Sequence, residues 1–358
     1  MNHTPYLLAL HRRLNLTRPR FEKLNAFFAE DWQKAYQGRI SDWQAAGLDK
    51  ASIEKFFASK EVFSPITEYE LLQGCGASFF TCFDSAYPDL WHNIAQPPAL
   101  FFYKGNGQNL NAKSITVVGS RKVTDYGRQI LQKVLKPVFE KRLNVVSGLA
   151  YGVDAAAHQL ALAVEAPTVA VLGNGIDEIY PKNNQPLADK ILAAGGTIIS
   201  EYLPKTEARP EYFPQRNRLV AGLSQATVVV EGALKSGSLI TARLANDFGR
   251  DVWAAPGDIF RTNSAGCNQL ISQGEAAALV SSDLLSEKLN LLNTTVLHDI
   301  DLSDSEKDLI RILKQKPAWQ LEDFMNEMRR PPSEISGILT MLEIKGVLKN
   351  TGRSVYLS

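Results

Sequence analysis

Val228-Val-Val-Glu-Gly-Ala-Leu-Lys-Ser-Gly-Ser-Leu-Ile-Thr-Ala242 is the stretch of the chain that decides its fold. The β-branched run from Val228 to Val230 predicts a strand buried in a parallel sheet. A loop of small residues that contains Lys235 follows, and helix-forming residues begin at Ser238. In α/β proteins a strand, a Gly/Ser loop and a helix form an anion site, because loop N–H groups and the helix N-terminus point at a phosphate. The stretch therefore predicts a phosphate-binding corner.

Strand and helix patterns alternate on both sides of this stretch. Apolar runs predict strands at Ser114–Val118, Asn144–Val146, Pro167–Leu172, Gly196–Ile199, Ala226–Val230 and Asp251–Ala254. Helical spacing predicts helices at Tyr126–Lys141, Asp154–Ala163, Gln185–Ala194, Phe213–Leu223 and Ser238–Phe248. The alternation predicts an α/β fold with a doubly wound parallel sheet, whose ligands bind at the carboxyl ends of the strands.

The two ends of the chain show different patterns. Residues 1–65 predict an all-helical module that is SAM-like or helix-hairpin-helix-like, and a protein–protein module explains the pattern equally well. We expect the sheet domain at 66–282 and a linker at 283–302. Residues 303–358 predict three helices and a β-hairpin that turns at Asn350-Thr-Gly352, which is the pattern of a winged helix-turn-helix.

Composition narrows the functional classes. The 358 residues carry a net charge of +1, so binding of a polyanion must depend on a local patch. Cys75, Cys82 and Cys267 are too few and too far apart for a disulfide framework or a zinc site, so we expect a reducing, cytoplasmic compartment. The sequence has no signal-peptide pattern and no uncharged apolar run of about 18 residues, so we expect no membrane partner.

The loops after the expected strands converge on one edge of the sheet and supply N–H groups, hydroxyls, amides and cations. The candidate phosphate- and base-contacting residues are Gly119, Ser120, Arg121, Ser147, Gly148, Asn217, Arg218, Lys235, Ser236, Gly237, Ser238 and Asn268. A Walker A loop needs lysine directly after its second glycine, whereas Gly237 is followed by Ser238, so ATP hydrolysis is not expected. The sequence lacks a zinc cluster, a G-x-S-x-G nucleophile and paired acids for magnesium, so it predicts a binding surface without catalytic residues, metal or cofactor.

Five segments in this order and spacing carry a resemblance. They are Val118-Gly-Ser-Arg121 with Tyr126-Gly127, Val146-Ser-Gly-Leu-Ala-Tyr-Gly-Val-Asp154, Phe213-Pro-Gln-Arg-Asn-Arg218, Lys235-Ser-Gly-Ser238 and Gly266-Cys-Asn-Gln-Leu-Ile271. Together they resemble the DprA (also called Smf) family of DNA-processing proteins. The resemblance covers roughly residues 66–282, and helical N-terminal modules and C-terminal winged helices occur in many members of this family.

The resemblance implies an extended Rossmann-like fold that binds single-stranded DNA, forms a homodimer and loads the RecA recombinase during natural transformation. It implies no enzymatic activity. The family's DNA-contacting loops correspond to Gly119–Arg121 and Lys235–Ser238, and Asn217, Arg218 and Asn268 match positions that line the same pocket.

Other side chains complete the expected interface. In the winged helix, Lys345, Lys349 and Arg353 are suited to contacts with phosphates. Aromatic residues of DNA-binding grooves stack on bases, and the candidates for that role are Tyr151, Phe213 and Phe260.

Two other classes of function stay open. Related nucleotide hydrolases place a glutamate closely after a Gly-rich loop, whereas Gly237 is followed by Ser-Leu-Ile-Thr-Ala-Arg-Leu-Ala without a carboxylate. A nucleotide-sensing transcription regulator would read duplex DNA with the helix expected at Pro332–Lys345, which has few side chains that read bases. Sequence-specific binding to duplex DNA favours the regulator, and a preference for single strands favours the DNA-processing family.

Overall fold

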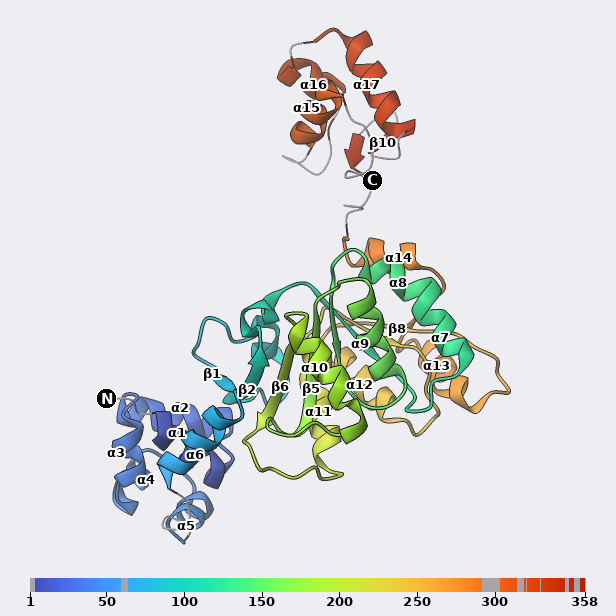
Figure 1. The fold of residues 1–358 in the computed structure, drawn as a ribbon. Coiled ribbons are helices and arrows are strands. Elements are labelled where there is room, and N and C mark those ends of the chain that lie inside the picture. Colours follow the sequence, from blue (N-terminus) through green and yellow to red (C-terminus); the bar gives the residue numbers. More distant parts are fainter. Residues whose placement is uncertain are drawn as a thin grey trace. The chain divides into compact units, whose positions relative to one another are not determined.

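The structure, a computed structural model, describes residues 4–58, 64–291, 303–313, 319, 321–328, 330–344, 348–350 and 355–357. The chain divides into two compact units, Met1–Ser282 and Asp283–Ser358, and each unit is described by itself (Figure 1). None of the helices in the described ranges is both long and apolar enough to cross a membrane.

The first unit begins with short helices. They are α1 (Thr4–Leu14), α2 (Arg18–Phe28), α3 (Trp32–Gln37), α4 (Ile40–Ala45), α5 (Lys50–Ala58) and α6 (Pro65–Gly74). Aromatic residues contribute much of their core, and the rings of Trp43 and Phe56 stack with centroids 4.2 Å apart. Mutual packing stabilises these helices, because helices of this length are marginal on their own. The SAM-like or helix-hairpin-helix character of the segment stays a prediction.

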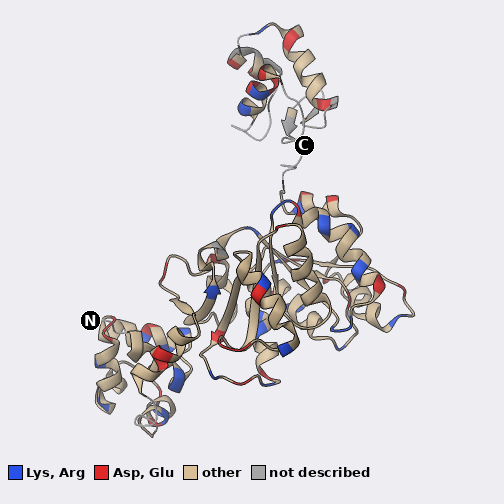
Figure 2. Ribbon diagram, in the orientation of Figure 1, with Lys and Arg blue, Asp and Glu red and all other residues tan. Residues whose placement is uncertain are grey.

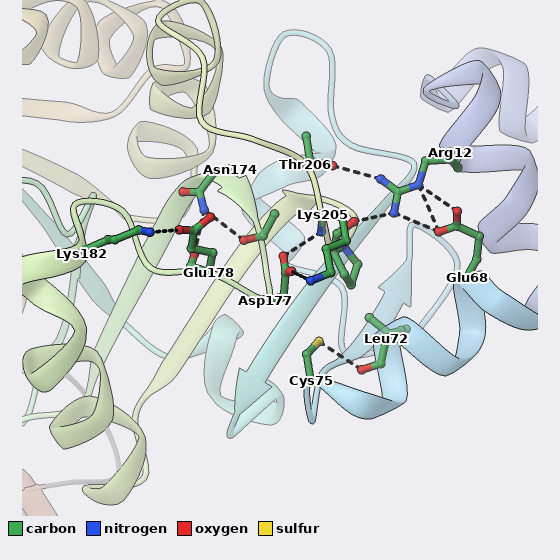
Figure 3. A network of polar contacts seen from close by, with 12 residues as sticks. Arg12, Glu68, Leu72, Cys75, Asn174, Asp177, Glu178, Lys182, Lys205 and Thr206 are labelled. Carbon is green, nitrogen blue, oxygen red and sulfur yellow. Dashed lines mark hydrogen bonds and ion pairs between the residues drawn. The ribbon is translucent and has the colours of Figure 1, made fainter. Parts of the chain in front are cut away.

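Arg12 joins these helices to the central sheet. Its guanidinium lies 2.9 Å from the carboxylate of Glu68 on α6. It also donates to the carbonyl of Pro204 at 2.5 Å and to the hydroxyl of Thr206 at 3.2 Å, in the segment after strand β6 (Thr197–Tyr202; Figure 3). The planar fork of the guanidinium thus bridges two elements, which fixes the N-terminal helices against the sheet.

A nine-stranded sheet forms the centre of the first unit. Its spatial order is β1 (Ser78–Thr81), β2 (Leu100–Gly105), β6, β5 (Thr168–Gly175), β4 (Asn144–Ser147), β3 (Ser114–Val118), β7 (Ala226–Val229), β8 (Asp251–Ala254) and β9 (Ala277–Ala278). The pairs β1–β2 and β2–β6 are antiparallel, and the remaining pairs are parallel. Strands β3, β4 and β5 are buried along their whole length, which explains their continuous apolar runs. The predicted α/β fold with a mostly parallel sheet is confirmed.

Helices cover the parallel strands in two layers (Figure 1). One layer holds α7 (Asp125–Ile130), α8 (Lys136–Phe139), α9 (Val153–Ala163) and α10 (Gln185–Ala193), and the other holds α11 (Tyr212–Gly222), α12 (Gly237–Asp247) and α13 (Thr262–Ser272). Short 3₁₀ turns lie at Asp89–Asn93, Gly107–Asn111 and Lys182–Asn184. Because β–helix–β crossovers are right-handed, the covering layer changes where the strand order reverses, between β3 and β7.

The helix expected at Tyr126–Lys141 is interrupted. A π-helical turn at Leu131–Leu135 separates α7 from α8, and the N–H of Lys136 donates to the carbonyl of Leu131. Pro137 has no N–H to donate, and its ring crowds the carbonyl four residues earlier. A wider turn just before the proline relieves this conflict without ending the helical segment.

Several elements differ from expectation. Strands β1 and β9 and helix α13 were not predicted from the sequence. Gly266, the first residue of the last resemblance segment, lies inside α13, where an added Cβ would come within 2.6 Å of the Gly232 carbonyl oxygen. This glycine therefore allows α13 to pack closely against the β7–α12 loop. Helix α14 (Ser282–Lys288) occupies the start of the segment expected to be a linker, and residues 292–302 of that segment lie outside the described residues.

The described part of the second unit contains α15 (Asp304–Leu313), α16 (Leu321–Met328), α17 (Pro332–Ile344) and the antiparallel pair of β10 (Leu348–Asn350) and β11 (Val355–Leu357). Leu309, Phe324, Ile335 and Leu342 are buried in a core of their own. The expected contact residues Lys345 and Arg353 lie outside the described residues, as does the side chain of Lys349. The winged-helix interpretation of these elements stays a prediction.

Candidate nucleic-acid interface

A groove of about 520 Å³ lies where the strand order reverses, at the carboxyl ends of β3 and β7. This position is the one at which open α/β sheets bind ligands. We call it the switch-point groove, and its lining residues are Val118, Gly119, Arg121, Ala150, Asp154, Tyr180, Pro210, Phe213, Pro214, Arg216, Asn217, Ser236, Gly237, Ser238, Ile240 and Thr241.

The β3–α7 loop forms one rim of the groove. An added Cβ on Gly119 would lie 2.7 Å from a methyl group of Val153, so glycine allows the loop to pass close to the start of α9. The carbonyl of Ser120 accepts the Val153 N–H at 3.0 Å, and the Ser120 hydroxyl accepts the Lys122 N–H at 3.1 Å. These contacts fix the backbone while the side chain of Arg121 stays exposed and lines the groove.

Glu231 ties this rim to the end of β7. Its buried carboxylate accepts the Thr124 N–H at 2.9 Å and also accepts the Thr124 hydroxyl. Thr124 caps the start of α7, where its hydroxyl accepts the Gly127 N–H at 3.3 Å. A Cβ on Gly127 would lie 2.5 Å from a carboxylate oxygen of Glu231, so glycine makes room for this acid. Packing thereby explains the glycine of the Tyr-Gly pair in the sequence motif.

Two buried ionisable residues, Asp154 and Arg216, are among the lining residues of the groove. Asp154 accepts the N–H groups of Gly148 and Ala150 at 3.2 and 3.4 Å, and Arg216 donates to the Gly148 carbonyl at 2.7 Å. Burial raises the pKa of Asp154, an effect that the nearby Arg216 charge opposes, and burial lowers the pKa of Arg216. Both side chains thus hydrogen-bond to backbone groups of the β4–α9 loop. At the end of β4 the Ser147 hydroxyl donates to the Val117 carbonyl at 2.6 Å. These groups therefore position the loop.

The start of α12 forms the opposite rim. Ser236 caps this helix, because its hydroxyl accepts the Ser238 N–H at 3.3 Å. The side-chain amide of Asn217 donates to the Gly237 carbonyl at 3.3 Å and so links α11 to this rim. The N-terminus of an 11-residue helix carries partial positive charge, which suits a phosphate. Lys235, exposed and one residue before the cap, adds a full charge beside it.

The positive charge of the groove is local. Basic and acidic residues are interspersed over the chain (Figure 2). In the described part of the molecule, neither Arg121 nor Lys235 takes part in an ion pair or a side-chain hydrogen bond that would neutralise it. Asp154 is the one carboxylate among the groove-lining residues, and it is buried against backbone N–H groups. No group of three His, Cys, Asp or Glu within the described ranges is placed to hold a metal ion.

Six of the predicted contact residues line the groove, namely Gly119, Arg121, Asn217, Ser236, Gly237 and Ser238. Arg218 and Asn268 are placed elsewhere. Arg218 lies 2.6 Å from the carboxylate of Glu201, and its Nε donates to the Gln96 carbonyl at 3.1 Å. Asn268 on α13 donates to the carbonyl of Gly257 at 2.9 Å and accepts its N–H at 3.1 Å. The polar groups of both residues thus already have partners within the protein.

The aromatic residues of the site were only partly predicted. Phe213 lines the groove, whereas Tyr151 and Phe260 are exposed outside its lining. Tyr180 lines the groove and was not proposed from the sequence. The signal for it was its place in the polar loop after β5, which opens on the same edge of the sheet.

Fold and groove together define an α/β protein of the doubly wound class, with a groove at its topological switch point that is lined by Arg121 and by the start of α12. Comparison with known proteins identifies the family. Residues 78–290 match the sequence profile of DNA recombination-mediator protein A, and the chain belongs to this family. DNA processing protein DprA of Streptococcus pneumoniae is 41% identical over 293 residues, which are 80% of this chain and 99% of the relative. Protein Smf of Synechocystis is 36% identical over 259 residues, 71% of this chain and 65% of the relative.

Solved structures agree with this assignment. The chain is similar to the X-ray structure of DprA from Streptococcus pneumoniae, with a TM-score of 0.69 and 34% identity over 79% of this chain and 98% of that one. It is also similar to DprA from Helicobacter pylori, a protein with a unique single-stranded DNA binding mode. That match has a TM-score of 0.54 and 27% identity, and it covers 60% of this chain and 95% of the other.

Proposed function

We propose that this chain binds single-stranded DNA in the switch-point groove, with phosphates held between Arg121 and the start of α12. The observation that carries the proposal is the unneutralised Arg121 in the lining of the groove together with the capped N-terminus of α12, which exposed Lys235 precedes by one residue outside the lining. Phosphate contacts of this kind supply most of the affinity for nucleic acid and carry no sequence preference. The single-stranded DNA binding mode of the relative from Helicobacter pylori supports the choice of ligand.

Membership of the family supports the wider role. We propose that the chain protects incoming single-stranded DNA and loads RecA on it during natural transformation, that it acts as a homodimer in the cytoplasm, and that it binds without catalysing a reaction. We also propose that the second unit is a winged helix-turn-helix, which its three helices and antiparallel strand pair support. Arg218 and Asn268 enter the proposal as residues that position the loops of the site.

A charge placed at the start of α12 tests the groove directly. No atom lies within 4 Å of a Cβ added to Gly237, so Gly237→Asp fits without a clash. A carboxylate in the first turn favours the helix, yet it repels phosphate. We expect fluorescence anisotropy to show roughly tenfold weaker binding of labelled oligothymidine to Gly237→Asp, and near wild-type binding to the neutral control Gly237→Asn.

The same titration with a matched duplex decides between the functional classes. Tighter binding of the single strand by the wild-type chain supports the proposal. Tighter binding of the duplex, or equal affinity of Gly237→Asp and Gly237→Asn for oligothymidine, contradicts it. Sequence-specific duplex binding would instead favour the nucleotide-sensing regulator.

A further inference from the structure

Part of the lining of the switch-point groove forms an aromatic wall. Tyr180 lines the groove with 48% of its surface exposed, and its ring lies 5.5 Å from the ring of Phe213 at an angle of 42°. Pro210 and Pro214 extend this wall along the start of α11. A half-exposed tyrosine supported by a second ring presents a free face to the groove.

The loop that carries Tyr180 is held in place by polar contacts. Asn174, which is 1% exposed, donates its amide to the carbonyls of Gly175 at 3.1 Å and Glu178 at 2.7 Å (Figure 3). Asp177 accepts the N–H of Lys205 at 2.9 Å, which ties the loop to the segment after β6. These contacts fix the backbone on the N-terminal side of Tyr180.

Contacts on the C-terminal side of Tyr180 also hold this loop in place. Glu178 precedes Tyr180 by two residues and Lys182 follows it by two. The carboxylate of Glu178 lies 3.2 Å from the ammonium of Lys182 (Figure 3). Asn184 donates to the Leu149 carbonyl at 2.8 Å and so joins the loop to the one after β4. A side chain with few torsions on a fixed loop loses little entropy on binding, so most of its contact energy is retained.

We propose that Tyr180, supported by Phe213, stacks on a base of the bound single strand. This inference rests on the proposed function and deepens it, because it orients the strand: the phosphates lie toward Arg121 and the start of α12, and the bases lie toward the β5–α10 loop. Stacking on an aromatic side chain does not depend on the identity of the base, so the contact adds affinity without sequence preference.

Oligothymidine and an abasic oligomer of the same length separate base contacts from phosphate contacts. We expect the wild-type chain to bind oligothymidine more tightly than the abasic oligomer in anisotropy titrations. Tyr180→Ala is expected to lose about 5- to 150-fold in affinity for oligothymidine, the value of one stacked base, and to bind the abasic oligomer like wild type. The slope of affinity with salt stays unchanged, because no charge is removed.

Two further variants control the experiment. Tyr180→Phe keeps the ring and is expected to retain the preference for oligothymidine. Phe83→Ala removes an aromatic residue of similar exposure, 52%, that packs on Phe21 and does not line the groove, and it is expected to bind both oligomers like wild type. If Tyr180→Ala is poorly folded, Tyr180→Leu takes its place, because leucine keeps an apolar side chain and removes the ring, and the same loss of preference for oligothymidine is expected.

The inference is overturned if the wild type binds both oligomers equally, or if Tyr180→Ala keeps the wild-type preference for oligothymidine. In both cases the proposed function stands when oligothymidine is bound and Gly237→Asp weakens it. Loss of oligothymidine binding by the wild type overturns the proposed function itself, and the inference with it.

Discussion

Two exposed cations and one paired cation in the same region have different consequences for DNA binding. Arg121 and Lys235 are exposed and have no ion-pair partner among the described residues. Arg218 lies 2.6 Å from Glu201, and the side chains of this pair are 14% and 17% exposed. We therefore expect Arg121→Ala and Lys235→Ala to weaken the electrostatic part of binding, whereas Arg218→Ala leaves that part unchanged.

The size of the effect follows from release of counterions. On single strands log Kobs falls with log salt by about 0.7 for each neutralised phosphate, so each of the two substitutions should lower the slope by about 0.7. When a side chain contributes to binding only through counterion release, its removal lowers the affinity about 8-fold at about 50 mM salt and about 3-fold at about 200 mM salt. The double variant should lower the slope by about 1.4 when each of the two side chains neutralises its own phosphate.

Anisotropy titrations of labelled oligothymidine over a series of KCl concentrations measure these slopes. Arg39→Ala is a matched control, because it removes an exposed arginine of the N-terminal helices that lies next to Asp42. The reasoning is refuted if Arg218→Ala lowers the slope as much as Arg121→Ala does. It is equally refuted if both Arg121→Ala and Lys235→Ala keep the wild-type slope.

Three predictions concern the frame of the site. In Gly148→Ala the new methyl group meets the Arg216 guanidinium at 2.6 Å, so urea denaturation should show a loss of about 1–3 kcal/mol. Glu231→Ala leaves the N–H and hydroxyl of Thr124 without their acceptor. We therefore expect the free energy of unfolding to fall by about 2 kcal/mol and hydrogen exchange in the β3–α7 loop to become faster. Unchanged exchange would contradict this. Burial lowers the pKa of His158 to about 3, so below pH 6.5 the unfolded chain binds a proton that the folded chain does not. From about pH 7.5 to about pH 5.5, the wild type should therefore lose about 1.4 kcal/mol more than His158→Gln, and parallel losses would refute the assignment.

The parallel strands were the most predictable part of the fold. Strands β3 and β8 have the bounds expected from the sequence, because unbroken apolar runs are characteristic of strands covered on both faces. Strand β1 was missed since Ser78-Phe-Phe-Thr81 is short, partly exposed and paired only with β2. Its formation depends on partner residues 19 to 25 positions further along the chain, from Thr81 with Leu100 to Ser78 with Tyr103, which local periodicity does not reveal.

The residues of the groove show the same contrast between local and long-range causes. The loops that carry Gly119, Arg121 and Ser236 were predictable, because glycine and serine between a strand and a helix have a local backbone reason. The pairing of Arg218 with Glu201 and the place of Tyr180 in the groove were not, since each depends on strands brought together by the sheet. Sequence motifs therefore predicted several residues that line the groove, and long-range packing decided which side chains there already have partners within the protein.

Photo-crosslinking tests the central claim most directly. An oligonucleotide that carries iodouracil is irradiated in complex with the full chain, and the attached peptides are mapped by mass spectrometry. The account predicts crosslinks in the loops after β3, β5 and β7 and at the start of α11, the elements that line the switch-point groove. Crosslinks confined to the N-terminal helices or to the second unit, with none in these loops, would contradict it.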